Sequence, residues 1–178
     1  MRSREPIVLL LGLAVVYVLS GWSPSDRATW WMQVAPVFAV LPVLLVLEQR
    51  VGFTSLTFRL LAFEAVLVAV GAHYTYAHVP LGFWVSDLLG LERNHYDRFG
   101  HFMQGVVPAL VMRELLLRTS PLRRGRWLFL IVSSICLAIS AIYEFIEWGA
   151  AIVFADGATE FLGTQGDPWD SQWDMFLA

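Results

Sequence analysis

Long apolar segments separated by short polar stretches make up most of the chain. Five of them are long enough, or nearly so, for the roughly 20 residues that a helix needs to cross the hydrocarbon of a bilayer. They lie near residues 6–22, 30–47, 58–78, 99–117 and 127–154. A sixth helix is predicted to begin at Pro168. The pattern therefore predicts an all-α fold, a polytopic transmembrane helical bundle with five complete spans plus the start of a sixth.

The sixth segment has a clear helical beginning, because Asp167 is a good N-cap and Pro168 suits the first helical position. From Pro168 to Ala178, at 1.5 Å per residue, this helix would reach only about halfway across a bilayer. We therefore expect residues 1–178 to form a single integral membrane domain that is truncated within its last span.

The composition agrees with a membrane protein. Apolar residues make up 57% of the chain and charged residues 15%, whereas ordinary soluble domains are about 45–50% apolar. The lipid bilayer is thus the first expected partner. A net charge of −3 and the lack of any nucleic-acid-binding motif argue against a nucleic-acid partner.

The twelve basic residues are all arginines, and their distribution predicts the orientation. If the segments alternate in direction, one side holds Arg2, Arg4, Arg50, Arg59, Arg113, Arg118, Arg123, Arg124 and Arg126. The other side holds only Arg27, Arg93 and Arg98. The positive-inside rule then predicts a multi-pass protein of the bacterial inner (cytoplasmic) membrane with a cytoplasmic N-terminus.

Three polar stretches fall at the predicted outer ends of the last three segments. Asp97, His101 and Gln104 stand at positions i, i+4 and i+7, which share one face of a helix. Glu144 and Glu147 are three residues apart on the fifth segment. Asp167, Asp170 and Asp174 have i, i+3, i+7 spacing on the sixth. We expect these faces to meet in one polar site, which Arg98 also borders.

An ionised carboxylate inside a membrane costs about 2.5–3.5 kcal/mol on insertion scales, so such groups must be paired, hydrated, protonated or bound to a cation. Arg93 and Arg98 can neutralise at most two of them. The remaining negative charge requires a metal ion, protons or a cationic substrate. If one divalent metal ion is bound, oxygen-rich ligation with one imidazole suits zinc, manganese or magnesium. The candidate ligands are Asp97, His101, Glu144, Glu147, Asp170 and Asp174. Glu147 and Asp174 are also the candidate catalytic bases.

Three functions remain open from these residues. The first is a metal-assisted hydrolase or transferase that acts on a lipid or lipid-linked envelope substrate. The second is a proton- or cation-coupled transporter of small molecules, in which His101 and the carboxylates titrate as a relay. The third is a non-catalytic scaffold that holds a structural cation. The sequence leaves open whether the protein is an enzyme, and its oligomeric state.

Two further features carry expectations. Glu64 lies in the middle of the third apolar segment, so we expect it to face the bundle interior, either protonated or paired with Arg59 or Arg113. The stretch 156–167 combines glycines with acidic residues. It fits either a cation or phosphate site at the next helix start, or a tight turn before a capped helix.

The three polar stretches also carry a resemblance. The runs 94–105 (NHYDRFGHFMQG), 143–148 (YEFIEW) and 161–175 (FLGTQGDPWDSQWDM) resemble the YjdF-type family of bacterial inner-membrane proteins, a domain-of-unknown-function family. The resemblance implies a multi-pass topology and gives weight to the three motifs, but it implies no reaction. Members of that family continue through a last span after the Asp174-Met175 pair, where this chain departs from them. A looser similarity of pattern links the chain to VanZ-like membrane proteins.

Overall fold

The computed structural model describes residues 5–154 and 163–178, and these residues are helical with no strand. The helices are α1 (Glu5–Trp22), α2 (Arg27–Val51), α3 (Ser55–Tyr74), α4 (Pro80–Leu89), α5 (Tyr96–Thr119), α6 (Arg126–Phe154) and α8 (Asp170–Leu177). A short 3₁₀ turn, η1 (Tyr76–His78), joins α3 to α4. The all-α prediction is confirmed, and every predicted segment coincides with a helix.

Four of the described helices are long and apolar enough to cross a membrane, namely α1, α2, α3 and α6. Helix α5 has 24 residues, but it carries Asp97 and Arg98 near its start and Arg113, Glu114 and Arg118 near its end. It is not among the four. The predicted count of five complete spans plus a sixth is therefore not confirmed, although the multi-helix membrane architecture is.

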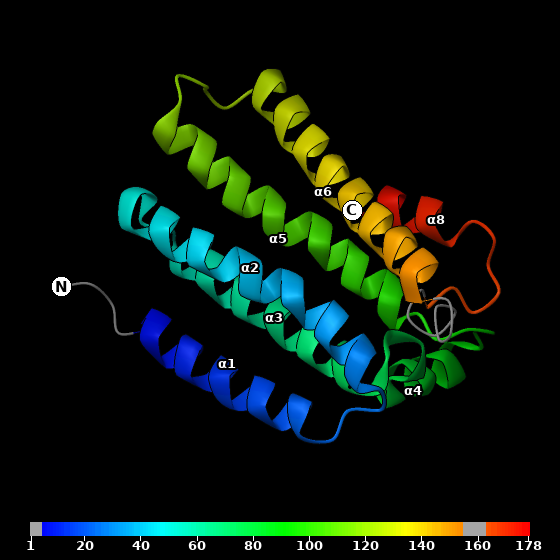
Figure 1. Cartoon of the computed structure of the whole chain (residues 1–178). Coiled ribbons are helices and arrows are strands. Elements are labelled where there is room, and N and C mark those ends of the chain that lie inside the picture. The colour runs from blue at the N-terminus through cyan, green and yellow to red at the C-terminus, as the bar shows by residue number, and fades with distance from the viewer. Residues whose placement is uncertain (1–4, 155–162) are drawn as a thin grey trace.

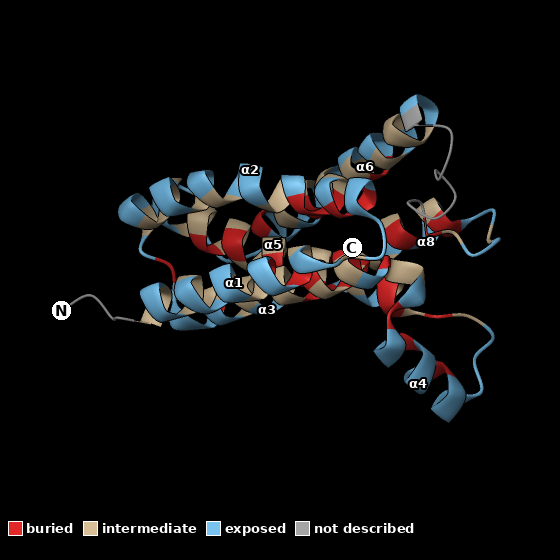
Figure 2. Cartoon of the chain, turned by 60° about the horizontal axis from the view of Figure 1, so that its bottom comes forward, coloured by how far each residue is buried: buried red, intermediate tan, exposed pale blue. Residues whose placement is uncertain are grey.

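Helix α5 is the centre of the arrangement. It packs against α3, α6, α8 and α2, and it lies between the α2–α3 pair and α6 (Figure 1). Helix α1 packs on α3, at the edge of the bundle. The short helix α4 projects from the same end of the bundle at which α8 lies (Figure 2). Because α5 touches most of the other helices, side chains on its faces are the ones that can meet groups from several elements.

Two apolar clusters hold the helices together. The first cluster lies where α1, α2 and α3 meet, and its buried members are Tyr17, Trp30, Val34, Ala69 and Ala72. The second lies where α3 and α5 meet, and its buried members are Leu67, Val79, Tyr96, Met103 and Val107. Many large apolar side chains remain exposed on the outside of the bundle (Figure 2). Such a surface suits hydrocarbon rather than water as the surrounding solvent.

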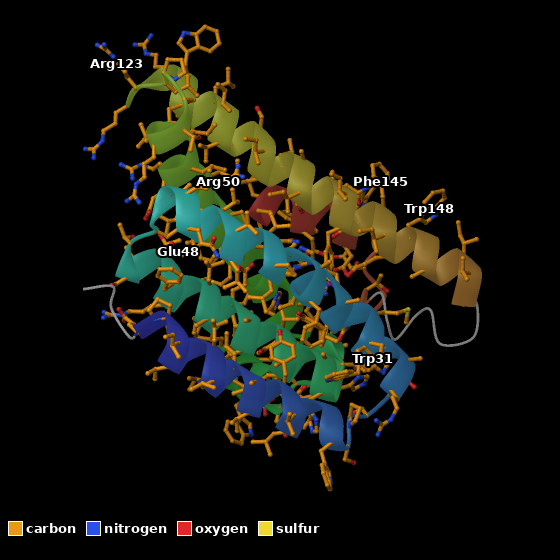
Figure 3. The ribbon with its side chains drawn as sticks, turned by 60° about the vertical axis from the view of Figure 1, so that its left-hand side comes forward. Trp31, Glu48, Arg50, Arg123, Phe145 and Trp148 are labelled. Carbon is orange, nitrogen blue, oxygen red and sulfur yellow. The ribbon has the colours of Figure 1, made fainter. Side chains whose placement is uncertain are left out.

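The two ends of the bundle differ in charge. Arg50 and Arg123 lie at one end, far from Trp31 and Trp148 (Figure 3). We call this the arginine-rich end, and the end at which α5 begins and α8 lies we call the site end. Arg50 and Arg123 thus lie at the same end of the bundle, as the sequence predicts. Which end faces the cytoplasm remains a prediction.

Helix α8 corrects one expectation. It begins at Asp170, after Trp169, rather than at Pro168, and Trp169 makes no side-chain cap. Residues 168–169 form a turn instead. Asp167 still accepts a hydrogen bond at Oδ1 from the backbone N of Trp169 (2.9 Å), as a capping carboxylate would. The carboxylate therefore closes a turn before the helix and is not its N-cap.

A buried carboxylate at the arginine-rich end, which the sequence did not single out, joins α3 to α5. Glu114 Oε1 accepts hydrogen bonds from the hydroxyls of Thr54 and Thr57 (2.6 Å each), and Oε2 accepts one from the backbone N of Thr54 (3.0 Å). Arg118 Nη2 lies 3.2 Å from Glu114 Oε2. Every oxygen of this carboxylate is satisfied, so its role is structural.

We predict that Glu114→Ala destabilises the protein, because it leaves the start of α3 without its acceptors. Breaking a buried charged network costs about 3–5 kcal/mol, which for a chain of this size is a melting temperature lower by roughly 6–20 °C. Thermal unfolding in detergent measures it. Glu92→Ala is the matched control, because Glu92 is exposed. Equal melting temperatures for the two variants would contradict the structural role.

Candidate metal centre

Four side chains from three helices converge at the site end. Asp97 and His101 come from the first turns of α5, Glu144 from α6 and Asp174 from α8, and all four are buried. Asp97 and His101 share a helical face because they are four residues apart. These are four of the six residues that the sequence places together, and that they form a functional site stays a prediction.

His101 is at the centre of the cluster. Its Nε2 lies 3.8 Å from Asp97 Oδ1, 3.8 Å from Glu144 Oε1 and 4.0 Å from Asp174 Oδ2. Its Nδ1 lies 3.0 Å from Gln104 Oε1. An amide oxygen can only accept, so Nδ1 is the donor in this contact, and Nε2 is the ring nitrogen left to face the carboxylates. Gln104 thus orients the imidazole so that Nε2 faces the three carboxylates.

The spacing suits a metal ion. Asp97, His101 and Asp174 each offer one ligand atom, and these atoms lie within 4.8 Å of one another. Metal bonds of about 2.1 Å place two ligand atoms roughly 3.0–3.5 Å apart, so modest side-chain movements would complete such a site. Glu144 Oε1 and Asp174 Oδ1 are buried and have no hydrogen-bond partner within the described part of the chain. Buried acceptors without a partner are costly, so these oxygens need a proton or a cation.

The neighbouring arginines are bound to other carboxylates. Arg93 Nη1 lies 2.7 Å from Asp170 Oδ1, and Arg98 Nη2 lies 2.5 Å from Asp167 Oδ2. A longer contact of 3.7 Å joins Arg98 Nη2 to Asp170 Oδ1. Asp170 therefore faces an arginine rather than His101, which separates it from the compact group. That Asp170 binds a metal ion remains a prediction.

The remaining predicted residues lie further out. Glu147 is half-buried on α6 and close enough to Asp97 and Glu144 to interact with them electrostatically. Glu64 is half-buried on α3, and the expected partner Arg59 is paired with Glu5 instead (2.6 Å). Of the predicted stretch 156–167, residues 156–162 lie outside the described part of the chain.

Two residues that the sequence did not single out join the elements around the cluster. Asn94 is 1% exposed, and its backbone N and O bond to Oε1 and Nε2 of Gln165 (3.0 and 2.8 Å). Its side chain donates to the Val79 carbonyl and accepts from the backbone N of Tyr96. This Asn94–Gln165 clamp ties the approach to α8 to the starts of α4 and α5. No sequence signal marks such a pairing.

Glycine is needed at position 163, next to the cluster. Gly163 is buried and has a φ of 62°, and a Cβ added there would lie 3.5 Å from Asp97 Oδ2. The left-handed backbone favours a residue without a side chain, whereas the 3.5 Å distance is an ordinary van der Waals contact. This glycine lets the chain pass directly over Asp97 on its way to α8.

Comparison with known proteins gives two findings and one absence. Residues 5–178 match a family described as "Predicted membrane protein (DUF2238)". The chain is 47% identical over 180 residues to "Inner membrane protein YjdF" of Escherichia coli (strain K12), an alignment that covers 99% of this chain and 86% of the relative. No solved structure matches the chain.

We predict that the Asp167–Arg98 pair contributes to stability in a pH-dependent way. The backbone N–H of Trp169, and then Arg98, lower the pKa of Asp167 below its usual value. A lowered pKa in the folded state means that the contribution is complete above the unfolded-state pKa of about 3.9 and is lost as the pH falls through the folded-state value. Asp167→Asn should therefore lower the melting temperature at pH 6, and the difference from wild type should shrink below about pH 4. A difference independent of pH would contradict the ion pair.

Proposed function

The chain belongs to the DUF2238 family of predicted membrane proteins, as its motifs predict, and we propose that it is a metal-dependent enzyme of the bacterial inner membrane. In this proposal Asp97, His101, Glu144 and Asp174 bind one divalent metal ion. The reaction is hydrolysis of, or group transfer from, a lipid or lipid-linked envelope substrate. The observation that carries the proposal is the buried Nε2 of His101, which faces three buried carboxylates that no described arginine neutralises.

Charge supports a cation at this place. Arg93 and Arg98 are paired with Asp170 and Asp167, so the three carboxylates around His101 bring up to three negative charges together. Two like charges 4 Å apart repel by roughly 4 kcal/mol at an effective dielectric constant of 20. A divalent ion removes this repulsion. Oxygen-rich ligation with one imidazole suits zinc, manganese or magnesium, and Gln104 would fix the imidazole from behind.

The neighbouring groups suit a hydrolytic reaction. When bound, the metal would polarise a phosphoryl or ester oxygen and acidify a water molecule. Glu147 lies one turn beyond Glu144 on α6 and belongs to no described ion pair, so it is our candidate for the base that takes the proton from water. Asp174, the other predicted base, belongs to the compact ligand group, which favours a ligand role for it.

The apolar outside of the bundle supports a lipid substrate. The described helices expose many large apolar side chains, which suit contact with lipid, so a lipid headgroup could reach the cluster from the bilayer. With the N-terminus in the cytoplasm, this headgroup would belong to the outer leaflet.

Ion-coupled transport is the second candidate. Glu64 favours it, because this acid is half-buried within the apolar helix α3 and forms no ion pair with any described arginine. Acids inside transmembrane helices often carry protons. A scaffold saturated by arginines is less well supported, because the two arginines next to the cluster, Arg93 and Arg98, are paired with Asp170 and Asp167.

We predict that the purified protein contains one equivalent of divalent metal and that His101→Ala and Asp174→Asn lose it. Each variant removes a ligand atom of the compact group. Elemental mass spectrometry measures the metal content. Asp87→Asn on α4 is the control, because Asp87 is exposed, and it should keep the metal. Folded protein without metal, in wild type as in variants, would contradict the proposal and favour titrating carboxylates.

We predict that Glu147→Gln keeps the metal but lowers turnover by roughly 10²–10⁴-fold, the usual contribution of a general base. Release of phosphate or headgroup from a panel of lipid phosphates and lipid esters measures it. Glu92→Gln, an exposed acid in the loop after α4, is the matched control. Unchanged turnover in Glu147→Gln would refute the role of Glu147. Metal binding without any turnover of the panel would instead favour the scaffold.

A further inference from the structure

Arg93 and Arg98 have N–H groups that their carboxylate partners do not use. The Nε and Nη2 of Arg93 and the Nε of Arg98 are buried without a hydrogen-bond partner among residues 5–154 and 163–178. The side chains as a whole are only 15% and 19% exposed. Buried donors are almost always paired in folded proteins. Three unpaired donors on two adjacent guanidinium groups therefore point to an acceptor that binds there.

The ion pairs are not those of a purely structural contact. A guanidinium that only neutralises a carboxylate commonly forms two parallel bonds to it. Here each arginine contacts both aspartates through a single nitrogen. Nη1 of Arg93 lies 2.7 Å from Asp170 Oδ1 and 3.4 Å from Asp167 Oδ2, and Nη2 of Arg98 bonds to Asp167 and lies 3.7 Å from Asp170 Oδ1. The ring of Trp173 lies 5.7 Å from Arg98 Cζ and helps to hold that guanidinium. The aspartates thus fix the arginines, while other N–H groups of both guanidinium groups stay buried without an acceptor among the described residues.

The two arginines border the metal centre. Arg98 directly follows Asp97, and Asp170 stands one helical turn before Asp174 on α8. Planar N–H groups arranged as a fork match the oxygens of a phosphate group, and arginine is the usual residue for this recognition. A tetrahedral anion held there would lie next to the proposed metal.

We propose that Arg93 and Arg98 form a phosphate-binding subsite, so that the substrate is a phosphate-bearing molecule. The inference deepens the proposed function and rests on it for the reaction, whereas recognition of phosphate by the arginines can be tested by itself. Because Asp167 and Asp170 already balance the two arginines, the bound anion adds negative charge beside an acidic cluster. Phosphate should therefore bind more tightly to the metal-loaded protein, and the two ligands should strengthen each other.

Arg93→Lys and Arg98→Lys test the subsite. Lysine keeps the positive charge that Asp170 and Asp167 need but lacks the Nε–H and the planar fork. The protein is purified in a maltoside detergent, which carries no phosphate. Binding of short-chain phosphatidic acid and of inorganic phosphate is measured by calorimetry, and metal content is measured on the same samples. Arg50→Lys, at the arginine-rich end, is the matched control.

The expected result is at least tenfold weaker binding of the phosphate probe in each site variant, with the metal content and Arg50→Lys unchanged. Preference for phosphatidic acid identifies a lipid headgroup as the source of the phosphate, and equal binding identifies free phosphate; both support the subsite.

Metal-loaded wild type that binds neither probe overturns the subsite and leaves the metal centre standing. Wild type without metal that still binds phosphate supports the subsite and overturns the metal-dependent function. Loss of metal in the lysine variants would mean that the arginines act only through the structure of the site, which also overturns the subsite.

Discussion

The burial of three carboxylates around one imidazole is the constraint that shapes the site end of the bundle. Asp97, Glu144 and Asp174 come from three different helices and lie within about 4 Å of His101 Nε2, so α5, α6 and α8 must be held in register around this point. The Asn94–Gln165 clamp and the pairs of Arg93 and Arg98 with Asp170 and Asp167 hold the approach to α8 in place. Asn94, Gln165 and the two arginine–aspartate pairs bond to one another, whereas the three carboxylates around His101 form no ion pair with a described arginine.

The two ends of the bundle show how structural and functional acids differ. Glu114 is buried at one end, and both of its oxygens are bonded to α3 or to Arg118. Glu144 and Asp174 are buried at the other end, and each keeps an oxygen without a partner. An evolved fold tolerates such unsatisfied groups mainly where a ligand completes them. This contrast favours a bound cation at the site end and a purely structural role at the arginine-rich end.

Sequence periodicity predicted the long helices because a lipid-facing helix must be apolar over its length. It missed α4, although Pro80 at the helix start and Gly90 at its end are ordinary boundary signals, because ten residues are too few to span a bilayer. Helical spacing placed Asp97 and His101 on one face. It could not assign Asp170 to Arg93, or find the Asn94–Gln165 clamp, because such pairings depend on how separate helices and loops approach one another. The number of spans is not confirmed, because α5 has the length of a span but charged ends.

The most direct test of the metal centre is pulsed electron paramagnetic resonance of the protein loaded with one equivalent of Mn²⁺, which detects nitrogen bound to the metal. The account predicts the coupling of a single imidazole nitrogen, lost in His101→Gln and retained in His73→Gln, since His73 bonds to the Ser20 carbonyl away from the cluster. Tightly bound manganese without any nitrogen coupling, or with coupling that survives in His101→Gln, would contradict a metal centre built on His101.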